Sequence, residues 1–306
     1  MAAEDLDRLV RGAAFAWLDQ QMARRGEVLP RALLQEGFSW EGHRVPLIGP
    51  QGIFKPAILP EIPLSVTTVP VVEGRERPYE DEMGPDGLLR YRYRGTDPNH
   101  RDNVGLRRAM ELQVPLVYLY GTARGWYRPE KPVFIVGDDP PGLTFTVAMD
   151  DPQLLQPDLS VEVVDDARRV YMTRLARHRV HQLAFRHRVL VAYRESCTMC
   201  RLRHVELLDA AHILPDTHPR GEPVVTNGLA LCKLHHAAFD RNIVGIRPDL
   251  LVEVRHDILA EIDGPMLRHG LQELQGSRLL VLPSRKAQHP DREALSERYE
   301  HFRSAG

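Results

Sequence analysis

Three cysteines and a histidine of this chain have the spacing of metal ligands. Cys197 and Cys200 form a C-x2-C pair, and Cys232 and His235 form a C-x2-H pair. Two such pairs supply the four sulfur and nitrogen ligands of a closed tetrahedral Zn²⁺ site, in which no position stays open for a substrate. We therefore expect a structural zinc at these four residues. The alternative is three buried cysteines of an intracellular protein without a metal.

A second histidine of the same stretch points to a different task. His236 directly follows His235, and neighbouring residues of a helix project about 100° apart, so His236 must face away from the zinc. Asp240 comes four residues later, on the same helical face. An imidazole and a carboxylate in this arrangement can share one divalent cation. The alternative is a solvated helix face with a local hydrogen bond.

Further polar residues lie between the two ligand pairs. His212 stands in the run A-H-I-L-P, with Asp209 three residues before it and Asn227 fifteen residues after it. Taken alone, such a histidine is more often a hydrogen-bonded core or surface residue than a catalyst. Its place in the order His212, Asn227, His236 gives the catalytic interpretation more weight.

This order of residues between two Cys-containing pairs resembles the HNH endonucleases, whose core is a β-hairpin followed by a helix that grips a metal ion. The similarity is greatest to the zinc-containing branch that includes modification-dependent restriction enzymes. It covers about 100 residues, from near Phe185 to near Arg285. The runs A-H-I-x-P, N-G-L-x-L-C and H-H-x-x-F-D are specific in combination, although each alone is weak.

The resemblance implies a role for each matching residue. His212 would be the general base that takes a proton from water, which suits an imidazole whose ordinary pKa lies near 6.5. His236 would hold a catalytic divalent ion, Mg²⁺, Mn²⁺ or another, that neutralises charge on the phosphate and the leaving oxygen. Asn227 would fix the loop geometry and orient His212. Asp240 corresponds to an additional ligand one helical turn beyond His236.

One position departs from the pattern of the family. Many HNH endonucleases carry an Asp or His as a metal ligand directly before the general base, whereas this chain has Ala211. Three alternatives follow: Asp209 reaches the metal, Asp240 replaces the absent ligand, or the site is too weak to cut. We favour His236 with Asp240 as ligands of the catalytic metal, and Asp209 as a third.

The composition is that of a soluble globular protein. The chain has 306 residues, of which 43% are hydrophobic and 27% charged, and this length accommodates two domains. No apolar run approaches the ~20 residues that span a bilayer, and the acidic start M-A-A-E-D-L-D-R is not a signal peptide. Cysteines assigned to metal indicate a reducing compartment, and the excess of Arg over Lys suggests a bacterium. We therefore expect a cytoplasmic bacterial protein without membrane contact.

Positive charge is concentrated in one segment, although the net charge is −2. Residues 167–194 contain eight arginines and no acid. Such a stretch beside a nuclease core is typical of a track for DNA phosphates. The arginines expected to make this contact are Arg174, Arg177, Arg186 and Arg188. The alternative is a solvated helix whose arginines pair with acidic groups of the N-terminal domain.

The overall pattern indicates an α+β protein with three parts. We expect residues 1–160 to form a mostly β N-terminal recognition domain, 161–194 a basic helical linker, and 195–306 the ββα-metal nuclease domain with a C-terminal extension. The N-terminal part opens with apolar residues at helical spacing and continues with short β-rich runs bounded by Gly and Pro. It loosely suggests a base-reading module of the PUA-like or SRA-like type.

Two segments of the N-terminal part carry the side chains that a base-reading pocket needs. The loop R-G-T-D-P-N-H-R-D-N contains Asp97 and Asn99, and the region that follows contains Tyr118 and Trp126. A base flipped out of the duplex is read by aromatic stacking and by hydrogen bonds to its Watson–Crick edge. The alternative is a polar turn beside strand aromatics that face a core.

The rest of the C-terminal part is expected to extend the nuclease core without chemistry of its own. The runs L-L-V-E-V-R and R-L-L-V-L-P are typical of strands, with a helix at 265–274 between them. A last helix covers 293–302, after Pro290 and Asp291, which fit a helix start.

Together these features predict a metal-dependent DNA endonuclease whose N-terminal domain selects a modified base, namely methylated or hydroxymethylated cytosine. Because double-strand cutting needs two active sites, we expect a homodimer on double-stranded DNA. One alternative is an HNH nuclease that does not depend on modification, whether nicking, homing or nonspecific. The other is a zinc-stabilised DNA-binding protein that has lost catalysis.

Overall fold

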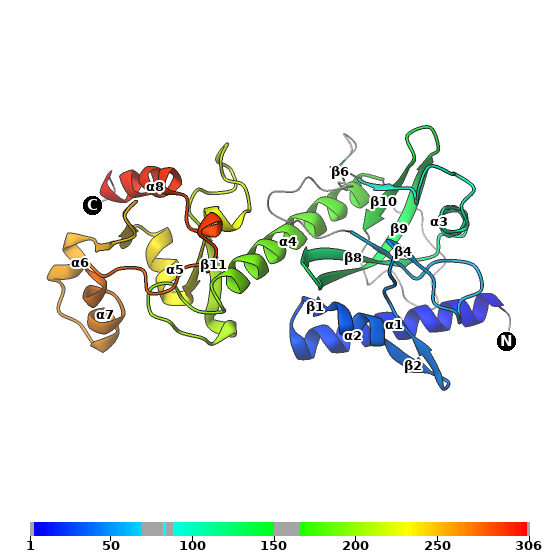
Figure 1. Ribbon diagram of the computed structural model, residues 1–306, viewed down its shortest axis with the longest axis horizontal. Coiled ribbons are helices and arrows are strands. Elements are labelled where there is room, and N and C mark those ends of the chain that lie inside the picture. Colours follow the sequence, from blue (N-terminus) through cyan, green and yellow to red (C-terminus); the bar gives the residue numbers. More distant parts are fainter. Residues whose placement is uncertain (1–2, 69–81, 84–87, 150–165, 305–306) are drawn as a thin grey trace. The chain divides into compact units, whose positions relative to one another are not determined.

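The chain divides into two units, Met1–Ala184 and Phe185–Gly306, each of which is described by itself (Figure 1). The computed structural model describes residues 3–68, 82–83, 88–149 and 166–304. Helix α4 (Asp166–Ala192) covers most of the segment expected to link two domains, and the boundary between the units falls inside it. The side chains of Arg174 and Arg177, two of the arginines expected to contact DNA, lie outside the described part.

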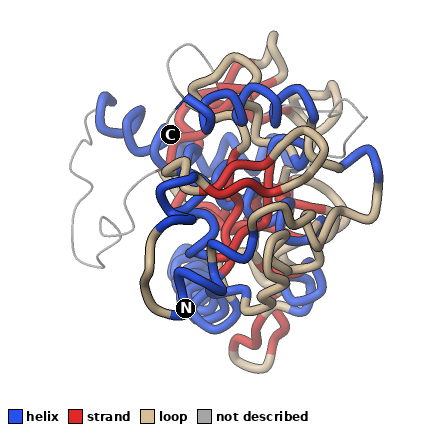
Figure 2. The backbone as a smooth tube through the Cα atoms, turned by 90° about the vertical axis from the view of Figure 1, so that its left-hand side faces the viewer, coloured by secondary structure: helices blue, strands red, loops and turns tan. Residues whose placement is uncertain are grey.

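The N-terminal unit is built on an eight-stranded sheet in the order β4-β5-β8-β9-β10-β7-β6, with β1 paired to β9 outside this path. All described pairs in this sheet are antiparallel except that of β5 with β8. The strands are β1 (Leu29–Pro30), β4 (Ile53–Phe54), β5 (Ser65–Thr67), β6 (Glu82–Met83), β7 (Leu89–Arg92), β8 (Leu116–Ala123), β9 (Trp126–Asp139) and β10 (Thr144–Met149). A separate hairpin, β2 (Phe38–Trp40) with β3 (His43–Val45), extends away from the sheet (Figures 1 and 2).

Strand β8 is buried on both faces of this sheet. Val117 and Leu119 pack in one hydrophobic cluster with residues of α1, whereas Tyr118 and Tyr120 pack in another with residues of α3. This is the alternation that a strand covered on both faces requires. Besides the first part of α4, the described helices of the unit are α1 (Ala3–Arg25), α2 (Arg31–Glu36) and α3 (Arg101–Glu111). The helical spacing at the start of the chain corresponds to α1, and the mixed α and β character of the chain is confirmed.

The C-terminal unit has a β-hairpin followed by a helix at its centre. Strands β11 (Leu208–His212) and β12 (Gly228–Cys232) are antiparallel, and α5 (Lys233–Asp240) begins directly after β12. The register pairs His212 with Gly228 and Leu208 with Cys232. This is the ββα arrangement that the resemblance implied.

Short elements surround the hairpin and α5. They are β13 (Val244–Ile246), β14 (Val252–Val254), α6 (His256–Ala260), α7 (Pro265–Gly270), α8 (Arg292–Ser304) and the 3-10 turns η2 (Val205–Leu207), η3 (Val225–Asn227), η4 (Gln272–Leu274) and η5 (Lys286–Gln288). Arg298 of α8 donates to the carbonyl of Phe239 at 2.6 Å, and its guanidinium carbon lies 4.7 Å from the centre of the Phe239 ring. Helix α8 therefore fixes the C-terminal end of α5.

Two expectations for the C-terminal extension were wrong. The run R-L-L-V-L-P does not form a strand: it makes one isolated bridge, between Leu251 and Arg278. Its backbone is used otherwise, because the amide of Leu280 donates to the carbonyl of Thr198 at 2.7 Å. The helix expected at 265–274 is divided after Gly270 into α7 and η4.

Candidate active site and metal centre

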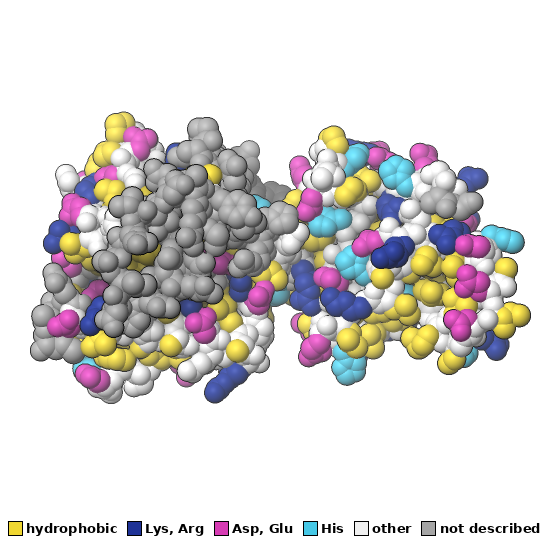
Figure 3. Space-filling view, turned by 180° about the vertical axis from the view of Figure 1, so that it is seen from behind, with side chains coloured by type: hydrophobic (Ala, Val, Ile, Leu, Met, Phe, Trp, Pro, Cys, Tyr) yellow, Lys and Arg dark blue, Asp and Glu magenta, His cyan; other side chains and the backbone are white. Residues whose placement is uncertain are grey.

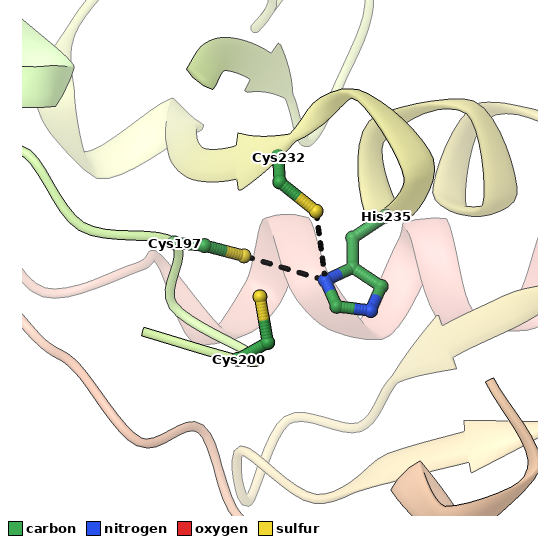
Figure 4. Close-up of side chains that lie close together, drawn as sticks. All are labelled: Cys197, Cys200, Cys232 and His235. Atoms are coloured by element: carbon green, nitrogen blue, oxygen red, sulfur yellow. Dashed lines mark hydrogen bonds between the residues drawn. The ribbon is translucent and has the colours of Figure 1, made fainter. Parts of the chain in front are cut away.

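The three cysteines and His235 form one cluster in the C-terminal unit. Their ligand atoms, the three Sγ atoms and a ring nitrogen, all lie within 4.8 Å of one another (Figure 4). Nδ1 of His235 is 3.4 Å from Sγ of Cys197 and 3.3 Å from Sγ of Cys232. A tetrahedral Zn²⁺ with its usual Zn–S and Zn–N bond lengths separates such atoms by about 3.5 Å. Cys197, Cys200, Cys232 and His235 thus fit a zinc ion in both chemistry and spacing.

His235 is held in the orientation that a zinc ligand needs. Its Nε2 lies 2.8 Å from the carbonyl oxygen of Gly270, at the end of α7, and this contact leaves Nδ1 facing the sulfurs. A backbone carbonyl on the far ring nitrogen is the usual partner of a metal-binding histidine. Burial lowers the pKa of His235, but the contacts with Cys197 and Cys232 outweigh it and raise this pKa to about 10. Zinc binding would therefore displace a proton from the cluster.

His236, the next residue of α5, faces a different environment. Its side chain is 23% exposed and lies between two carboxylates. Nδ1 is 3.6 Å from Oδ2 of Asp209, and Nε2 is 3.2 Å from Oδ2 of Asp240. Hydrogen bonds with Asp209 and Asp240 raise the pKa of His236 to about 9. The carboxylate of Asp240 beside Nε2 would also favour a divalent cation at this ring nitrogen.

Asp209 and Asp240 approach His236 from opposite ring nitrogens, so they do not converge on one point. Within the described part of the chain, the cysteine cluster is the group in which three or more ligand atoms meet. His236 with Asp240 offers a pair of ligands, one imidazole nitrogen and one carboxylate. This pair fits a cation that keeps its remaining positions for water and phosphate oxygens.

Asp209 is already neutralised by neighbouring cations. Nζ of Lys233 lies 3.1 Å and Nε of Arg186 3.5 Å from its carboxylate oxygens. Burial raises the pKa of Asp209, but hydrogen bonds with His236 and Lys233 outweigh burial and hold this pKa well below its usual range. The carboxylate is thus ionised and is placed to orient His236.

Ala211 lies on the same face of β11 as Asp209, because residues two apart in a strand share a face. Its side chain is fully buried in the hydrophobic core of the unit. The residue before His212 therefore packs internally, and Asp209, two residues earlier, makes the contact with His236.

His212, at the end of β11, is held by an aromatic ring and a carboxylate. Its imidazole stacks on Phe185 of α4 with ring centres 3.9 Å apart and an interplanar angle of 16°. Nε2 lies 2.8 Å from Oδ1 of Asp216, although the two atoms do not have the geometry of a hydrogen bond. Burial lowers the pKa of His212, which favours the neutral ring that a general base needs. Sequence reasoning missed Phe185 and Asp216; only the four-residue spacing from His212 to Asp216 gave a signal.

Asn227 closes the loop between the two strands. Its Oδ1 accepts from the amide of Leu214 at 2.9 Å, and its Nδ2 donates to the carbonyls of Leu214 at 3.0 Å and Glu222 at 3.1 Å. Its own carbonyl accepts from the amide of Ile213 at 3.0 Å. The loop is thus tied to the residues directly after His212, and the Asn227 side chain acts on the loop rather than on the His212 ring.

Two of the arginines expected to contact DNA donate within the C-terminal unit. Nη2 of Arg186 donates to the carbonyls of Val205 and Leu208, each at 3.0 Å. Nη2 of Arg188 donates to the carbonyl of Pro223 at 2.8 Å. These bonds position loops around the hairpin.

The residues expected to form a base pocket lie in different settings of the N-terminal unit. Tyr118 is 2% exposed in the core, and Trp126, at the start of β9, is 38% exposed. Asp97 and Asn99 are exposed in the turn before α3, where Oδ1 of Asp97 accepts from the amide of Asn99 at 2.9 Å.

A cavity of about 650 Å³ opens beside the start of α3 in the N-terminal unit. It is lined by Pro50, Gln51, Ile53, Phe54, Lys55, Pro60, Glu61, Pro63, Arg101, Asp102, Val104 and Gly105.

Comparison with known proteins identifies the class of the C-terminal unit. Residues 197–247 match the family model of the HNH endonucleases, and this range contains both ligand pairs, the hairpin and α5. The unit thus contains an HNH endonuclease domain, and the enzyme is a hydrolase that cleaves DNA. A solved structure, the modification-dependent TagI restriction endonuclease, aligns with a TM-score of 0.29 and 16% identity over 80% of this chain and 81% of that chain.

No curated protein matches the chain. Among the described helices, none is long and apolar enough to cross a membrane.

Proposed function

We propose that this enzyme is a restriction endonuclease that cuts double-stranded DNA containing methylated or hydroxymethylated cytosine. The C-terminal unit would cut, and the N-terminal unit would select the base. The observation that carries the nuclease chemistry is the position of His212 at the end of the hairpin, with the His236–Asp240 pair on the adjoining helix. Since each chain has one such site, a homodimer would supply the two cuts.

In this proposal His212 is the general base. Stacking on Phe185 fixes the plane of its ring, and Asp216 lies beside Nε2. Nδ1 is then the nitrogen that takes a proton from the attacking water. The ring is suited to this because burial lowers its pKa and so favours its neutral form.

His236 and Asp240 would hold the catalytic divalent ion, Mg²⁺ or Mn²⁺. When bound, such an ion neutralises charge on the phosphate and on the leaving oxygen. Asp209 would accept from Nδ1 of His236 and so present Nε2, as carboxylates behind metal-binding histidines do. Asn227 would keep the loop after His212 in place. Zinc at the cysteine cluster would stabilise the unit without taking part in the reaction.

Base selection would use the cavity beside α3 in the N-terminal unit. At about 650 Å³ the cavity is large enough for a nucleobase. Phe54 and three prolines offer apolar faces for stacking, and Gln51 offers an amide for hydrogen bonds. We place the base-reading function at this cavity because Tyr118 is buried in the core, where it cannot stack on a base.

A second candidate is an HNH endonuclease that does not depend on base modification. It is favoured by the separate placement of Tyr118, Trp126, Asp97 and Asn99, the residues from which the sequence suggested a pocket.

The test is cleavage of matched plasmids that carry cytosine, methylcytosine or hydroxymethylcytosine, with Mg²⁺ or Mn²⁺. We expect cutting of modified DNA only, its loss in His212→Ala, and its reduction in Gln51→Ala. Equal cutting of all plasmids would support the second candidate, and unchanged cutting by His212→Ala would exclude His212 as the base.

A further inference from the structure

A cavity of about 440 Å³ lies in the C-terminal unit next to the cysteine cluster, and three of its lining residues are arginines. Its lining consists of Arg194, Ser196, Arg201, Arg203, Leu280 and Val281. None of these residues is acidic. The face of the unit that Figure 3 shows carries side chains of both signs of charge, whereas the charged residues that line this cavity are three arginines.

The turn that carries Cys197 and Cys200 builds one wall of this cavity. The amide of Arg201 donates to the carbonyl of Cys197 at 2.9 Å, and the amide of Cys197 donates to the carbonyl of Leu202 at 2.9 Å. Val281, another residue of the lining, is tied to the same turn through Thr198, whose hydroxyl donates to the carbonyl of Val281 at 2.6 Å. Zinc binding at the turn would therefore also hold the shape of the cavity.

The guanidinium groups of this cavity are not neutralised by carboxylates. Within the described part of the chain, Arg201 and Arg203 make no ion pair. Arg194 donates only to neutral oxygens, those of Ser284 at 3.2 Å and Leu282 at 3.4 Å. Elsewhere in the unit, Arg186 and Arg220 face carboxylates. The cavity thus presents positive charge that no carboxylate among the described residues pairs with.

Two of the three arginines stand where the backbone does not favour them. Arg194 has φ of 54° and Arg201 has φ of 61°. Residues other than glycine are uncommon in this left-handed region, and asparagine is the better-tolerated exception. Backbone preference therefore does not explain arginine at these two positions.

We infer that this cavity binds a phosphate of the DNA backbone, as an anchor separate from His212 and His236. The inference rests on the DNA-cleaving function of the unit. Guanidinium groups match phosphate oxygens in a fork geometry, and contacts with phosphates supply sequence-independent affinity and fix the register of a protein on the duplex. The sequence suggested DNA contact at Arg186 and Arg188 of α4. The inferred phosphate site instead uses the three arginines of the loop that follows α4.

The test compares DNA binding by variants of the zinc-loaded protein that also carry His212→Ala, so that the DNA is not cleaved during the measurement. Arg201→Gly removes the side chain and suits the positive φ, so its melting temperature should not fall. It is combined with Arg203→Ala, and Arg303→Ala, an exposed arginine of α8, is the matched control. Fluorescence anisotropy with an unmodified duplex at several salt concentrations gives the affinity and its salt dependence.

We expect the double variant to bind DNA about tenfold more weakly and the slope of log K against log salt to become shallower by about 0.9, the value for one phosphate. In a protein that keeps His212, Arg201→Gly with Arg203→Ala should raise KM for DNA and leave kcat unchanged. Inorganic phosphate should compete only at high concentration, because one phosphate alone lacks the rest of the duplex contacts.

Two results would overturn the inference, and they have different meanings. If the double variant binds like Arg303→Ala while the wild type cuts DNA, the anchor is absent but the proposed function stands. If the wild type neither binds nor cuts any duplex, both claims fail.

Discussion

His235 and His236 are neighbours on α5, yet their rings lie among different kinds of side chains. His235 is 2% exposed, and its ring lies between two sulfurs and the carbonyl of Gly270. His236 is partly exposed and lies between the carboxylates of Asp209 and Asp240. A closed set of soft ligands retains zinc, whereas an open pair leaves positions for water and phosphate. On the proposed function, a single step along α5 would separate a metal that stabilises the fold from a metal that takes part in catalysis.

The largest expected effect concerns the closed site. Removing zinc with a strong chelator, or replacing Cys232 by Ser, should unfold the C-terminal unit. The apparent binding energy of structural zinc, about 10–16 kcal/mol, is comparable to the whole stability of a domain. Circular dichroism during heating, with zinc content measured on the same samples, checks this. An unchanged melting curve after verified zinc removal would show that the cluster is not structural.

The next effect concerns the general base. His212→Ala should lower the rate of cleavage by roughly 10²–10⁴, the usual contribution of a positioned acid or base, and should leave DNA affinity intact. Single-turnover cleavage and anisotropy measure the two quantities. His256→Ala, at the exposed start of α6, is the matched control and should cut like the wild type. Equal rates for the two variants would remove His212 from the mechanism.

A smaller effect should distinguish the two carboxylates beside His236. Asp240→Asn removes a proposed metal ligand, so it should lower cleavage more than Asp209→Asn, whose orienting role is worth about 10–100-fold. Titration with Mn²⁺ should partly restore Asp240→Asn and should restore Asp209→Asn less. The reverse order of the two losses would make Asp209 the ligand.

The smallest effect tests the support of His212. A Cβ at Gly228 would lie 2.5 Å from Cγ2 of Val189 and 3.0 Å from the ring of Phe185, on which His212 stacks. Gly228→Ala should therefore destabilise the unit by about 1–3 kcal/mol and slow cleavage. Gly264→Ala meets no atom within 4 Å and serves as the control. Equal melting temperatures for the two variants would contradict this packing.

The comparison also explains how much of the site was predictable from the sequence. Ligand pairs such as Cys197 with Cys200, and the divergence of His235 from His236, depend on local geometry that spacing encodes. The stacking of His212 on Phe185 is different, because these residues are far apart in sequence and meet only when α4 packs on the hairpin. The interior position of Ala211 likewise follows from the tertiary packing of β11.

The N-terminal unit was less predictable for a related reason. Its first helix and several strands follow local patterns, as in α1, which forms where apolar residues recur at helical spacing. The order of its strands does not, since β5 pairs in parallel with the distant β8. Because both faces of β8 are covered, Tyr118 is a core residue. The sequence alone does not distinguish an aromatic residue of a core from one of a pocket.

The account is tested most directly by comparing His235→Ala with His236→Ala in zinc content, melting temperature and cleavage rate. We predict that His235→Ala loses zinc and unfolds, whereas His236→Ala keeps its zinc and its melting temperature but loses cleavage. Loss of zinc in His236→Ala, or cleavage at the wild-type rate in that variant, would contradict the division of α5 between two metals.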